Sequence, residues 1–210
     1  MTLLTVWADD DPDTVLAQTD DGEAIADELK QLGVRFERWP VVEDLPAKPT
    51  SDEVLAAYEP YVARVVENEG YILVDALHMT PEDTEEWQTK AAEARQKFLS
   101  EHTHDDDEDR FFARGAGVFY LHVDAPERGT GPRTPSGARQ SGRVYAVLCE
   151  AGDLLSVPAG TRHWFDMGTN PSFVAIRFFR EPEGWVGQFS GDDVATRFPT
   201  FDALVAPVAG

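Results

Sequence analysis

The chain has 210 residues, a length that suits one domain with a sizeable buried core. Its 18 basic and 39 acidic residues give a formal net charge of -21, which argues against nucleic acid and anionic membranes as partners. The single cysteine, Cys149, excludes an internal disulfide and fits a reducing compartment; with no apolar run of membrane-spanning length and no basic-then-apolar leader, a cytoplasmic protein is expected.

The first half of the chain mixes strand-like and helical patterns. A capping box at Asp20–Glu23 precedes a helical stretch that ends at Gly33, and Thr50 with Glu53 caps a second helix. The expected elements are a strand at 3–7, a helix at 24–32, a strand at 34–39, a helix from 50 to about 70 that Pro60 kinks or splits, and a helix that starts at Thr80–Pro81. We therefore predict a mixed first half with three helices.

From about Phe98 onward the pattern changes to short strand-like runs separated by turn residues. These runs lie at 111–112, 118–123, 144–148, 154–157 and 173–179. Several short strands at such spacing indicate a β-sandwich or a small barrel. Residues 125–142 are rich in Gly, Pro and Ser and poor in apolar side chains, so they are predicted to be a flexible insertion loop. The fold class expected is mainly β with an α-helical N-terminal part.

One group of residues stands out for its chemistry: His102, His104 and Glu108, followed after a gap by His163. Residues separated by an even number of positions on a strand face the same side of the sheet, so the first two imidazoles and the carboxylate would point to the same side. The acidic, turn-prone stretch between them can fold the chain back so that the carboxylate meets the imidazoles. A set of three nitrogens and one oxygen suits iron, nickel, manganese or zinc and disfavours magnesium and calcium.

These residues fit the two sequence motifs of the cupin superfamily. The first motif, H-x-H-x3-E-x6-G, is matched by His102, His104, Glu108 and Gly115, and the second, G-x5-P-x-G-x2-H-x3-N, is matched by Gly152, Pro158, Gly160 and His163. Two positions depart from the pattern: Gln96 replaces a glycine before the first motif, and Met167 replaces the final asparagine. Neither departure touches the proposed ligands.

The resemblance extends to a particular cupin family, the bacterial acireductone dioxygenases. It is carried by the runs at 97–104, 108–117, 157–168, 170–177 and 183–193, and Met167 belongs to the usual pattern of that family. The resemblance implies one cupin domain over residues 1–210, a double-stranded β-helix of jelly-roll type. Residues 1–97 would form its mixed α/β N-terminal part and residues 98–193 its metal-binding barrel.

The same resemblance implies an activity in methionine salvage, with acireductone and O2 as partners and one Fe(II) or Ni(II) per chain. The family uses O2 to cleave 1,2-dihydroxy-3-keto-5-methylthiopentene. With Fe(II) the products are 2-keto-4-methylthiobutyrate and formate, and with Ni(II) they are 3-methylthiopropionate, carbon monoxide and formate. The protein is expected to be a monomer.

Residue roles follow from matching positions in the family. His102, His104, Glu108 and His163 would bind the metal. Arg110, two residues beyond Glu108, should face the same interior, where a guanidinium favours an ionised substrate; the simpler interpretation is a surface salt bridge with the neighbouring aspartates. Three aromatic residues would line the substrate pocket, and two carboxylates would assist metal loading or conformational transmission: Phe98, Phe165 and Trp185, then Glu101 and Asp107.

Two other functions compete with this hypothesis. One is a different metal-dependent cupin dioxygenase, acting on a thiol or a flavonol. The other is a cupin that binds a small molecule without catalysis. The position of Arg110 and the run Trp185–Phe189 favour the acireductone dioxygenase over both.

Overall fold

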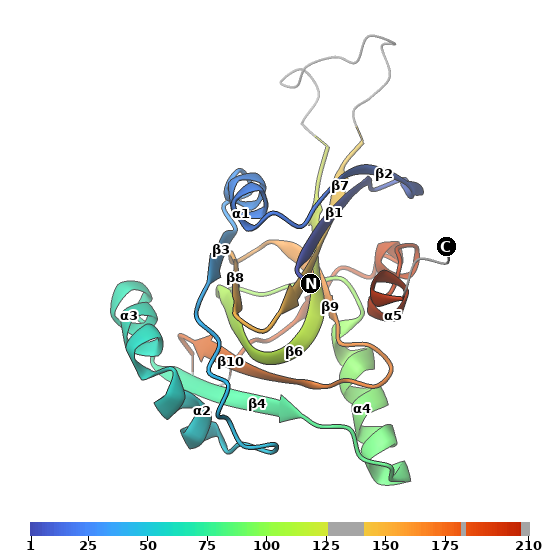
Figure 1. Ribbon diagram of the computed structural model, residues 1–210. Helices are drawn as coiled ribbons and strands as arrows, with labels where there is room; N and C mark the ends of the chain where they lie inside the picture. The colour runs from blue at the N-terminus through green and yellow to red at the C-terminus, as the bar shows by residue number, and fades with distance from the viewer. Residues whose placement is uncertain (126–140, 182–183, 207–210) are drawn as a thin grey trace.

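The computed structural model describes residues 1–125, 141–181 and 184–206. In these residues eleven strands form one branched sheet, with helices on its outside (Figure 1). The strands are β1 (Leu3–Ala8), β2 (Asp11–Thr19), β3 (Arg35–Arg38), β4 (Leu73–Met79), β5 (His102–Thr103), β6 (Glu108–Val123), β7 (Arg143–Glu150), β8 (Asp153–Val157), β9 (Arg162–Asp166), β10 (Phe173–Phe179) and β11 (Gln188–Phe189). The helices are α1 (Gly22–Lys30), α2 (Ser51–Ala57), α3 (Glu59–Glu69), α4 (Glu85–Phe98) and α5 (Phe201–Val205), with a 3-10 turn at Val194–Thr196.

The branched sheet has two parts, called the two sheets below, and the long strand β6 belongs to both. Its second half pairs with β7 and β9 in the order β11-β5-β9-β6-β7-β1-β2. Its first half pairs with β8 and β10, which continue to β3 and β4. All these pairings are antiparallel, and Figure 1 shows β6 curving from one sheet into the other. Two sheets that share a curved strand are the architecture in which a jelly roll encloses its core.

Two glycines allow the bend in β6. Gly115 has φ of +71°, and a Cβ there would lie 1.9 Å from the carbonyl oxygen of Ser172 on the approaching chain. A Cβ on Gly117 would lie 2.5 Å from the ring of Phe165. The strand therefore bends at a residue that tolerates the left-handed conformation, and its neighbour leaves room for an interior aromatic ring. The two runs predicted at 111–112 and 118–123 are thus parts of one strand.

Alternating side chains of β6 enter three different apolar cores. Phe112 and Phe119 face the interior between the two sheets, where Ile25 and Leu29 of α1 also pack. Phe111 faces outward under α2 and α3, in a core that includes Tyr58 and Val65. Residues Val118 and Tyr120 face the opposite outside, under the 3-10 turn and α5. Helices α2, α3 and α5 therefore form outer layers, whereas α1 contributes to the interior core between the two sheets.

The helix predictions hold in part. Thr50 caps α2 with the expected capping box, and α3 follows directly with Pro60 in its first turn and ends at Gly70 in the left-handed conformation. The predicted start of the last helix at Thr80–Pro81 is wrong. The helix starts at Glu85, because the Thr84 hydroxyl accepts a hydrogen bond from the backbone N–H of Trp87 and acts as its N-cap.

Several strands have no counterpart in the prediction. Strand β2 is largely exposed, so it lacks the apolar alternation by which a half-buried strand is recognised. Strand β4 also lacks clear alternation, because half-buried residues follow one another along it. The strand expected through His102 and His104 is present only as β5, at His102–Thr103. Strands β9 and β11 have five and two residues, too few for a clear periodic pattern. Each is held by its neighbours across the sheet rather than by its own composition.

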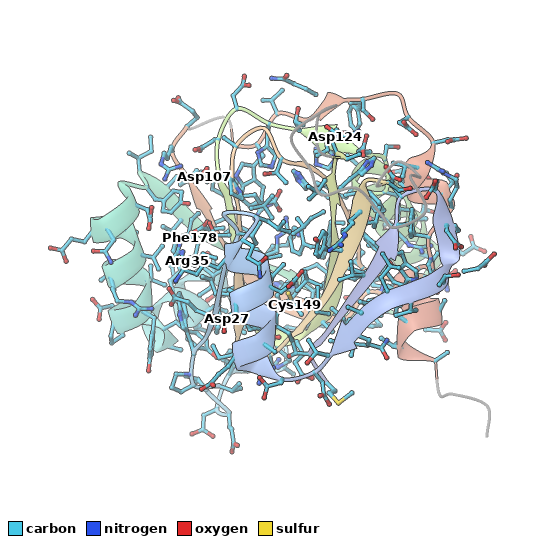
Figure 2. The ribbon with its side chains drawn as sticks, turned by 90° about the horizontal axis from the view of Figure 1, so that it is seen from above. Asp27, Arg35, Asp107, Asp124, Cys149 and Phe178 are labelled. Atoms are coloured by element: carbon cyan, nitrogen blue, oxygen red, sulfur yellow. The ribbon has the colours of Figure 1, made fainter. Side chains whose placement is uncertain are left out.

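Cys149 lies in β7 and is fully buried in the interior core, as expected of a structural thiol (Figure 2). Burial raises the pKa of this thiol well above its usual range, so it stays protonated and unreactive. Of the predicted insertion at 125–142, residues 126–140 lie outside the described part of the chain. Among the residues that are described, none of the helices has the length and apolar character needed to span a membrane.

Candidate metal centre

Three short stretches bring the predicted ligands together at one end of the interior. His102 on β5 and His163 on β9 are directly opposite each other in the antiparallel pair. Glu108 begins β6, which pairs with β9 through Leu121, the partner of His163. Two ligands therefore face each other across one ladder, and the third enters from the start of the strand that joins the two sheets.

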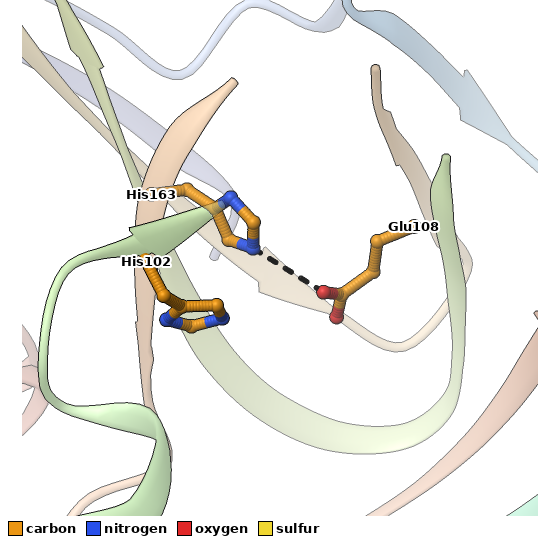
Figure 3. Close-up of side chains that lie close together, drawn as sticks. All are labelled: His102, Glu108 and His163. Carbon is orange, nitrogen blue, oxygen red and sulfur yellow. Dashed lines mark ion pairs between the residues drawn. The ribbon is translucent and has the colours of Figure 1, made fainter. Parts of the chain in front are cut away.

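His102, Glu108 and His163 form a compact set (Figure 3). Their nearest ligand atoms all lie within 4.8 Å of one another, and all three residues are buried. Figure 3 shows the His163 ring directed at the Glu108 carboxylate; His163 Nε2 lies 3.4 Å from Glu108 Oε2. Mutual distances of this size fit ligands that surround one metal ion.

The hydrogen bonds of these two histidines determine which nitrogen is available. His102 Nδ1 lies 2.8 Å from the carbonyl oxygen of Ser100, and His163 Nδ1 lies 2.8 Å from that of Thr161. A carbonyl oxygen can only accept a hydrogen bond, so Nδ1 carries the proton in each neutral ring. The lone pair is then on Nε2, and this outer-sphere bond is the one that metal-binding histidines commonly make.

His104 reaches the same centre by a turn. Strand β5 ends at Thr103, so the expected strand parity does not apply to His104, which instead lies in the turn before β6. Its Nδ1 lies 2.5 Å from the carbonyl oxygen of Asp106, and its Nε2 lies 3.0 Å from Glu108 Oε2. His104 is not one of the compact set of three. Like His163, however, it has Nδ1 near a backbone carbonyl and Nε2 near the Glu108 carboxylate.

The charge states of the buried groups suit a cation. Burial alone would raise the pKa of Glu108, but Arg110 and the neighbouring imidazoles outweigh it and hold that pKa well below its usual range. Burial, followed by the proximity of His163, lowers the pKa of His102 and favours its neutral form. Among the described residues, His163 Nε2 is a buried polar atom without a hydrogen-bond partner. Burial would lower the pKa of His104, but its hydrogen bond with Glu108 outweighs this and raises that pKa. One carboxylate and three imidazoles, each of which would bind an ion in its neutral form through Nε2, are a donor set that a divalent ion would satisfy.

Arg110 is buried beside this centre rather than at the surface. Its Nη2 donates to Glu108 Oε1 at 2.6 Å, and the side chain is 6% exposed. The guanidinium carbon lies 4.5 Å from the ring centroid of Phe165, 5.1 Å from that of Phe119 and 5.4 Å from that of Trp185. The surface salt bridge with the nearby aspartates is therefore wrong, because an aromatic enclosure removes this cation from water.

A cavity of about 560 Å³ opens onto His102, His104 and Glu108. Its lining comprises Leu73, Asp75, Lys97, Phe98, His102, His104, Glu108, Arg177, Phe179, Gly184, Trp185, Val186, Gly187 and Phe189. Phe98 and Trp185, two of the predicted pocket aromatics, thus form part of the wall. The third, Phe165, packs in the interior core against Arg110. The cavity is large enough for a small organic molecule.

The turn between β5 and β6 is fixed to the cavity wall. Trp185 donates its indole N–H to the carbonyl oxygen of Asp107 at 3.1 Å, and its ring stacks on His104. The Asp107 carboxylate accepts from the backbone N–H of Ala159 at 2.9 Å and from Arg180 at 2.8 Å. Asp107 therefore connects the ligand-bearing turn to the loop before β9, the strand that carries His163, and to the segment that carries the aromatic wall.

Glu101 lies behind the site, away from the cavity. Its Oε1 lies 2.5 Å from Nδ1 of His122, and Arg162 approaches its other oxygen at 3.8 Å. Both Glu101 and His122 are buried. His122 thus belongs to a buried polar cluster next to His102.

Sequence reasoning missed several residues of the cavity wall. Leu73 and Asp75 lie on β4, a strand that was not predicted, so nothing placed them near the site. Arg177 lies on β10 and pairs with Asp75 through two hydrogen bonds of 2.8 and 2.6 Å. The composition of β10 was the available signal, because Arg177 interrupts an otherwise continuous apolar strand.

Comparison with known proteins agrees with this geometry. The sequence profile of the ARD/ARD' family matches residues 4–128 and 137–187. The chain is 58% identical to an acireductone dioxygenase of Saccharopolyspora erythraea over 206 residues, which cover 98% of this chain and 99% of that protein. The chain belongs to the acireductone dioxygenase family. The family predicted from the sequence is therefore confirmed, and so is its enzyme class, a metal-dependent dioxygenase that acts on a small molecule with O2.

Further relatives support the assignment to the acireductone dioxygenases. One from Frankia alni is 50% identical over 204 residues, covering 97% of this chain and 91% of that protein. A solved structure, an acireductone dioxygenase from Bacillus anthracis with a cadmium ion in its active centre, has a TM-score of 0.69 and 26% identity, covering 90% of this chain and 98% of that one. The cupin fold expected from the sequence is confirmed, although the strand pairs in the described residues form an open sheet rather than a closed ring.

Proposed function

We propose that this enzyme cleaves the acireductone 1,2-dihydroxy-3-keto-5-methylthiopentene with O2 in methionine salvage, at a metal held by His102, His104, Glu108 and His163. The observation that carries the proposal is the orientation of the three imidazoles. Each uses Nδ1 on a backbone carbonyl and leaves Nε2 for the centre where the buried carboxylate lies. The open cavity leaves room for a substrate at the same centre.

Either Fe(II) or Ni(II) suits this donor set, with one ion per chain. Imidazole and carboxylate ligands accept both ions, and nickel is generally bound more tightly than ferrous iron. A bound ion would supply a Lewis-acidic centre that organises the enediol oxygens of the substrate and brings substrate and O2 together. The chain contributes the ionised state of Glu108 and, at each of the three histidines, a backbone carbonyl that accepts the Nδ1 proton.

Arg110 would stabilise the negative charge of the substrate. A guanidinium that is always protonated, and that is enclosed by three aromatic rings, opposes developing negative charge without reorganisation. Its bond to Glu108 fixes its position on the side of the carboxylate away from His104, because the two side chains contact different carboxylate oxygens. We assign Arg110 as the residue that favours the ionised substrate.

The apolar wall would accommodate the methylthio tail. Phe98 and Trp185 line the cavity, and Phe179 packs against Trp185 with ring centroids 4.5 Å apart. Phe165 would act from the layer beneath, through Arg110. Such a wall favours a thioether over water and limits access of solvent to the reacting carbons.

Glu101 and Asp107 would act by positioning rather than by contact with substrate. Asp107 fixes the turn that carries His104, through Ala159 and Arg180. The backbone carbonyl of Glu101 accepts from Ser190 at 3.1 Å, which holds the end of β5 beside His102. Metal loading would then depend on the Asp107 carboxylate, which fixes the turn that carries His104, and on the Glu101 carboxylate, which contacts His122 on β6 and Arg162 next to His163.

The proposal includes the organisation of the molecule. Residues 1–210 would form one cupin domain, with 1–97 as its mixed N-terminal part and 98–193 as its metal-binding barrel. All the proposed site residues come from a single chain, so a monomer would suffice. The charge of -21 and the single cysteine support a cytoplasmic enzyme without nucleic acid or membrane partners. Size-exclusion chromatography with light scattering tests the monomer.

Reconstitution of the apo enzyme tests the function. With Fe(II) we expect 2-keto-4-methylthiobutyrate and formate, and with Ni(II) 3-methylthiopropionate, carbon monoxide and formate, measured by product chromatography and headspace gas analysis. Apo protein is the control for spontaneous oxidation. Identical products from both metals would reject the dual chemistry. No consumption of acireductone with either metal, together with turnover of a thiol or a flavonol, would favour another cupin dioxygenase; binding without turnover would favour a non-catalytic cupin.

A further inference from the structure

Lys97 lies at the mouth of the metal-facing cavity. It occupies the last turn of α4, directly before Phe98, and it lines the cavity together with that aromatic ring. Its ammonium nitrogen lies 5.6 Å from the Phe98 ring centroid, so the side chain folds over the cavity wall rather than away from it. Helix α4 fixes the position of the Lys97 backbone, and the contact with the Phe98 ring places the ammonium group.

The other charged groups of the cavity wall already have partners. Asp75 and Arg177 neutralise each other through two hydrogen bonds, and Glu108 is paired with the buried Arg110. For Lys97, no carboxylate of the described residues lies within 4.0 Å of the ammonium group. Among the described residues, Lys97 is therefore the cavity-lining cation without a salt bridge, and its charge can act on an incoming molecule.

The surrounding charge makes this cation important for an anionic substrate. The chain carries a net charge of -21, which repels anions at long range. At physiological salt the repulsion is screened beyond about 8 Å, so charges near the opening decide the last part of the approach. An enediol conjugated to a ketone is an acidic group, because its anion is delocalised onto the carbonyl oxygen, and at neutral pH it reaches the enzyme with a negative charge.

We propose that Lys97 captures the anionic substrate at the cavity mouth and selects reductone anions over neutral enediols. This inference rests on the proposed function, because it assigns Lys97 to the same substrate. The proposal gives different roles to the two cations near the site. Arg110 is buried and acts on the bound molecule, whereas Lys97 is exposed and acts on the approach. A charge at an exposed rim changes the association rate and its salt dependence more than it changes the chemical step.

The test compares Lys97→Gln with Lys90→Gln in the metal-loaded enzyme. Lys90 lies on the same helix, is 70% exposed and is paired with Glu86 at 2.7 Å, so its substitution removes the same charge outside the cavity. For Lys97→Gln we expect kcat/KM for acireductone to fall about 3- to 10-fold at low salt, with kcat changed less than about twofold. Its kcat/KM should depend less on added NaCl than that of the wild type, and Lys97→Arg should restore both values.

Two further outcomes decide the proposal. If Lys97→Gln matches Lys90→Gln in kcat/KM and in salt dependence, the capture role is rejected. If kcat falls as much as kcat/KM, Lys97 acts on the chemical step and the capture role is rejected as well. Equal metal content and circular dichroism of the variants exclude a folding effect. Absence of acireductone consumption by the wild type would instead reject the proposed function, and with it the substrate assigned to Lys97.

Discussion

The space between the two sheets has two regions that are built in opposite ways. In the interior core, residues such as Phe112, Leu155 and Phe173 contribute only apolar surface and are almost completely buried. At the metal centre, His102 and His163 are equally buried but are polar. The core gains free energy from each side chain removed from water, whereas each buried polar group must recover its lost hydration through a specific partner.

The two regions therefore differ in what can replace a residue. The core tolerates another apolar side chain of similar volume, because its energy depends on area and packing. The metal centre depends on individual atoms, since His163 uses Nδ1 on a backbone carbonyl and Nε2 toward the centre. We expect substitutions in the centre to affect function far more than stability, and substitutions in the core to do the opposite.

The largest effect is expected for His163→Ala. Removing one ligand of the compact set should reduce metal affinity more than about 100-fold, because loss of outer-sphere partners alone commonly costs 10- to 100-fold. Metal analysis of the purified protein measures this directly, and acireductone turnover should disappear with the metal. His78→Ala is the matched control, since His78 is exposed on β4. Full metal content in His163→Ala would remove this residue from the ligand set.

The next effect is expected for Arg110→Ala. If the guanidinium opposes negative charge on the substrate, turnover should fall about 100- to 1000-fold while the metal remains bound. Arg143→Ala, at an exposed position on β7, removes the same charge away from the site. Steady-state kinetics and metal analysis of both variants make the comparison. Near-normal kcat in Arg110→Ala would contradict the assigned role.

The sequence predicts the centre better than its surroundings, and the reason is local. The ligands belong to two motifs with fixed spacing, so the motifs and the family resemblance specify them without the fold. Even there, the strand assumed through His104 ends at Thr103, although His104 faces the same cavity as His102 from the following turn. The cavity wall depends on which strands pair, and β4, which supplies Asp75, shows too little alternation to be recognised.

Long-range polar contacts could not be predicted for the same reason. Arg95 and Asp166 form a pair with distances of 2.7 and 3.0 Å although 71 residues separate them in the chain. Neither has an unusual neighbour in the sequence. The pairing appears only when α4 packs against β9. The apolar residues of β6, in contrast, are visible in the sequence as continuous apolar runs.

The core side of the comparison is tested by Leu155→Ala. Leu155 is fully buried on β8, and removing three carbons from such a position typically costs about 2–5 kcal/mol of unfolding free energy. Leu16→Ala is matched in chemistry but lies on β2 with 52% exposure, and should change stability by less than about 0.5 kcal/mol. Urea unfolding of the apo proteins gives both values. Loss of metal binding by folded Leu155→Ala would contradict the separation of the two regions.

The smallest effect is expected at a charged group that belongs to the structure rather than to the centre. Asp166 accepts hydrogen bonds from Arg95 and from the backbone N–H groups of Gly168 and Phe201. Burial by itself would raise the pKa of this carboxyl, but these bonds outweigh it, and the pKa lies below its ordinary value. A depressed pKa means that the folded state favours the ionised form, so Asp166 stabilises the protein above the pKa of the unfolded chain.

The stabilisation by Asp166 should therefore be complete at pH 7 and pH 5 and should decline as the pH falls below about 4. Asp166→Asn should cost about 1–2 kcal/mol at pH 7, because the amide keeps an acceptor but loses the charge that Arg95 faces. Asp27→Asn, at an exposed position on α1 (Figure 2), is the control. Urea unfolding of the apo proteins at pH 7, 5 and 3 measures the difference between wild type and variant. A difference that stayed constant down to pH 3 would show that the charge of Asp166 contributes nothing, and one that vanished between pH 7 and 5 would place the titration on another group.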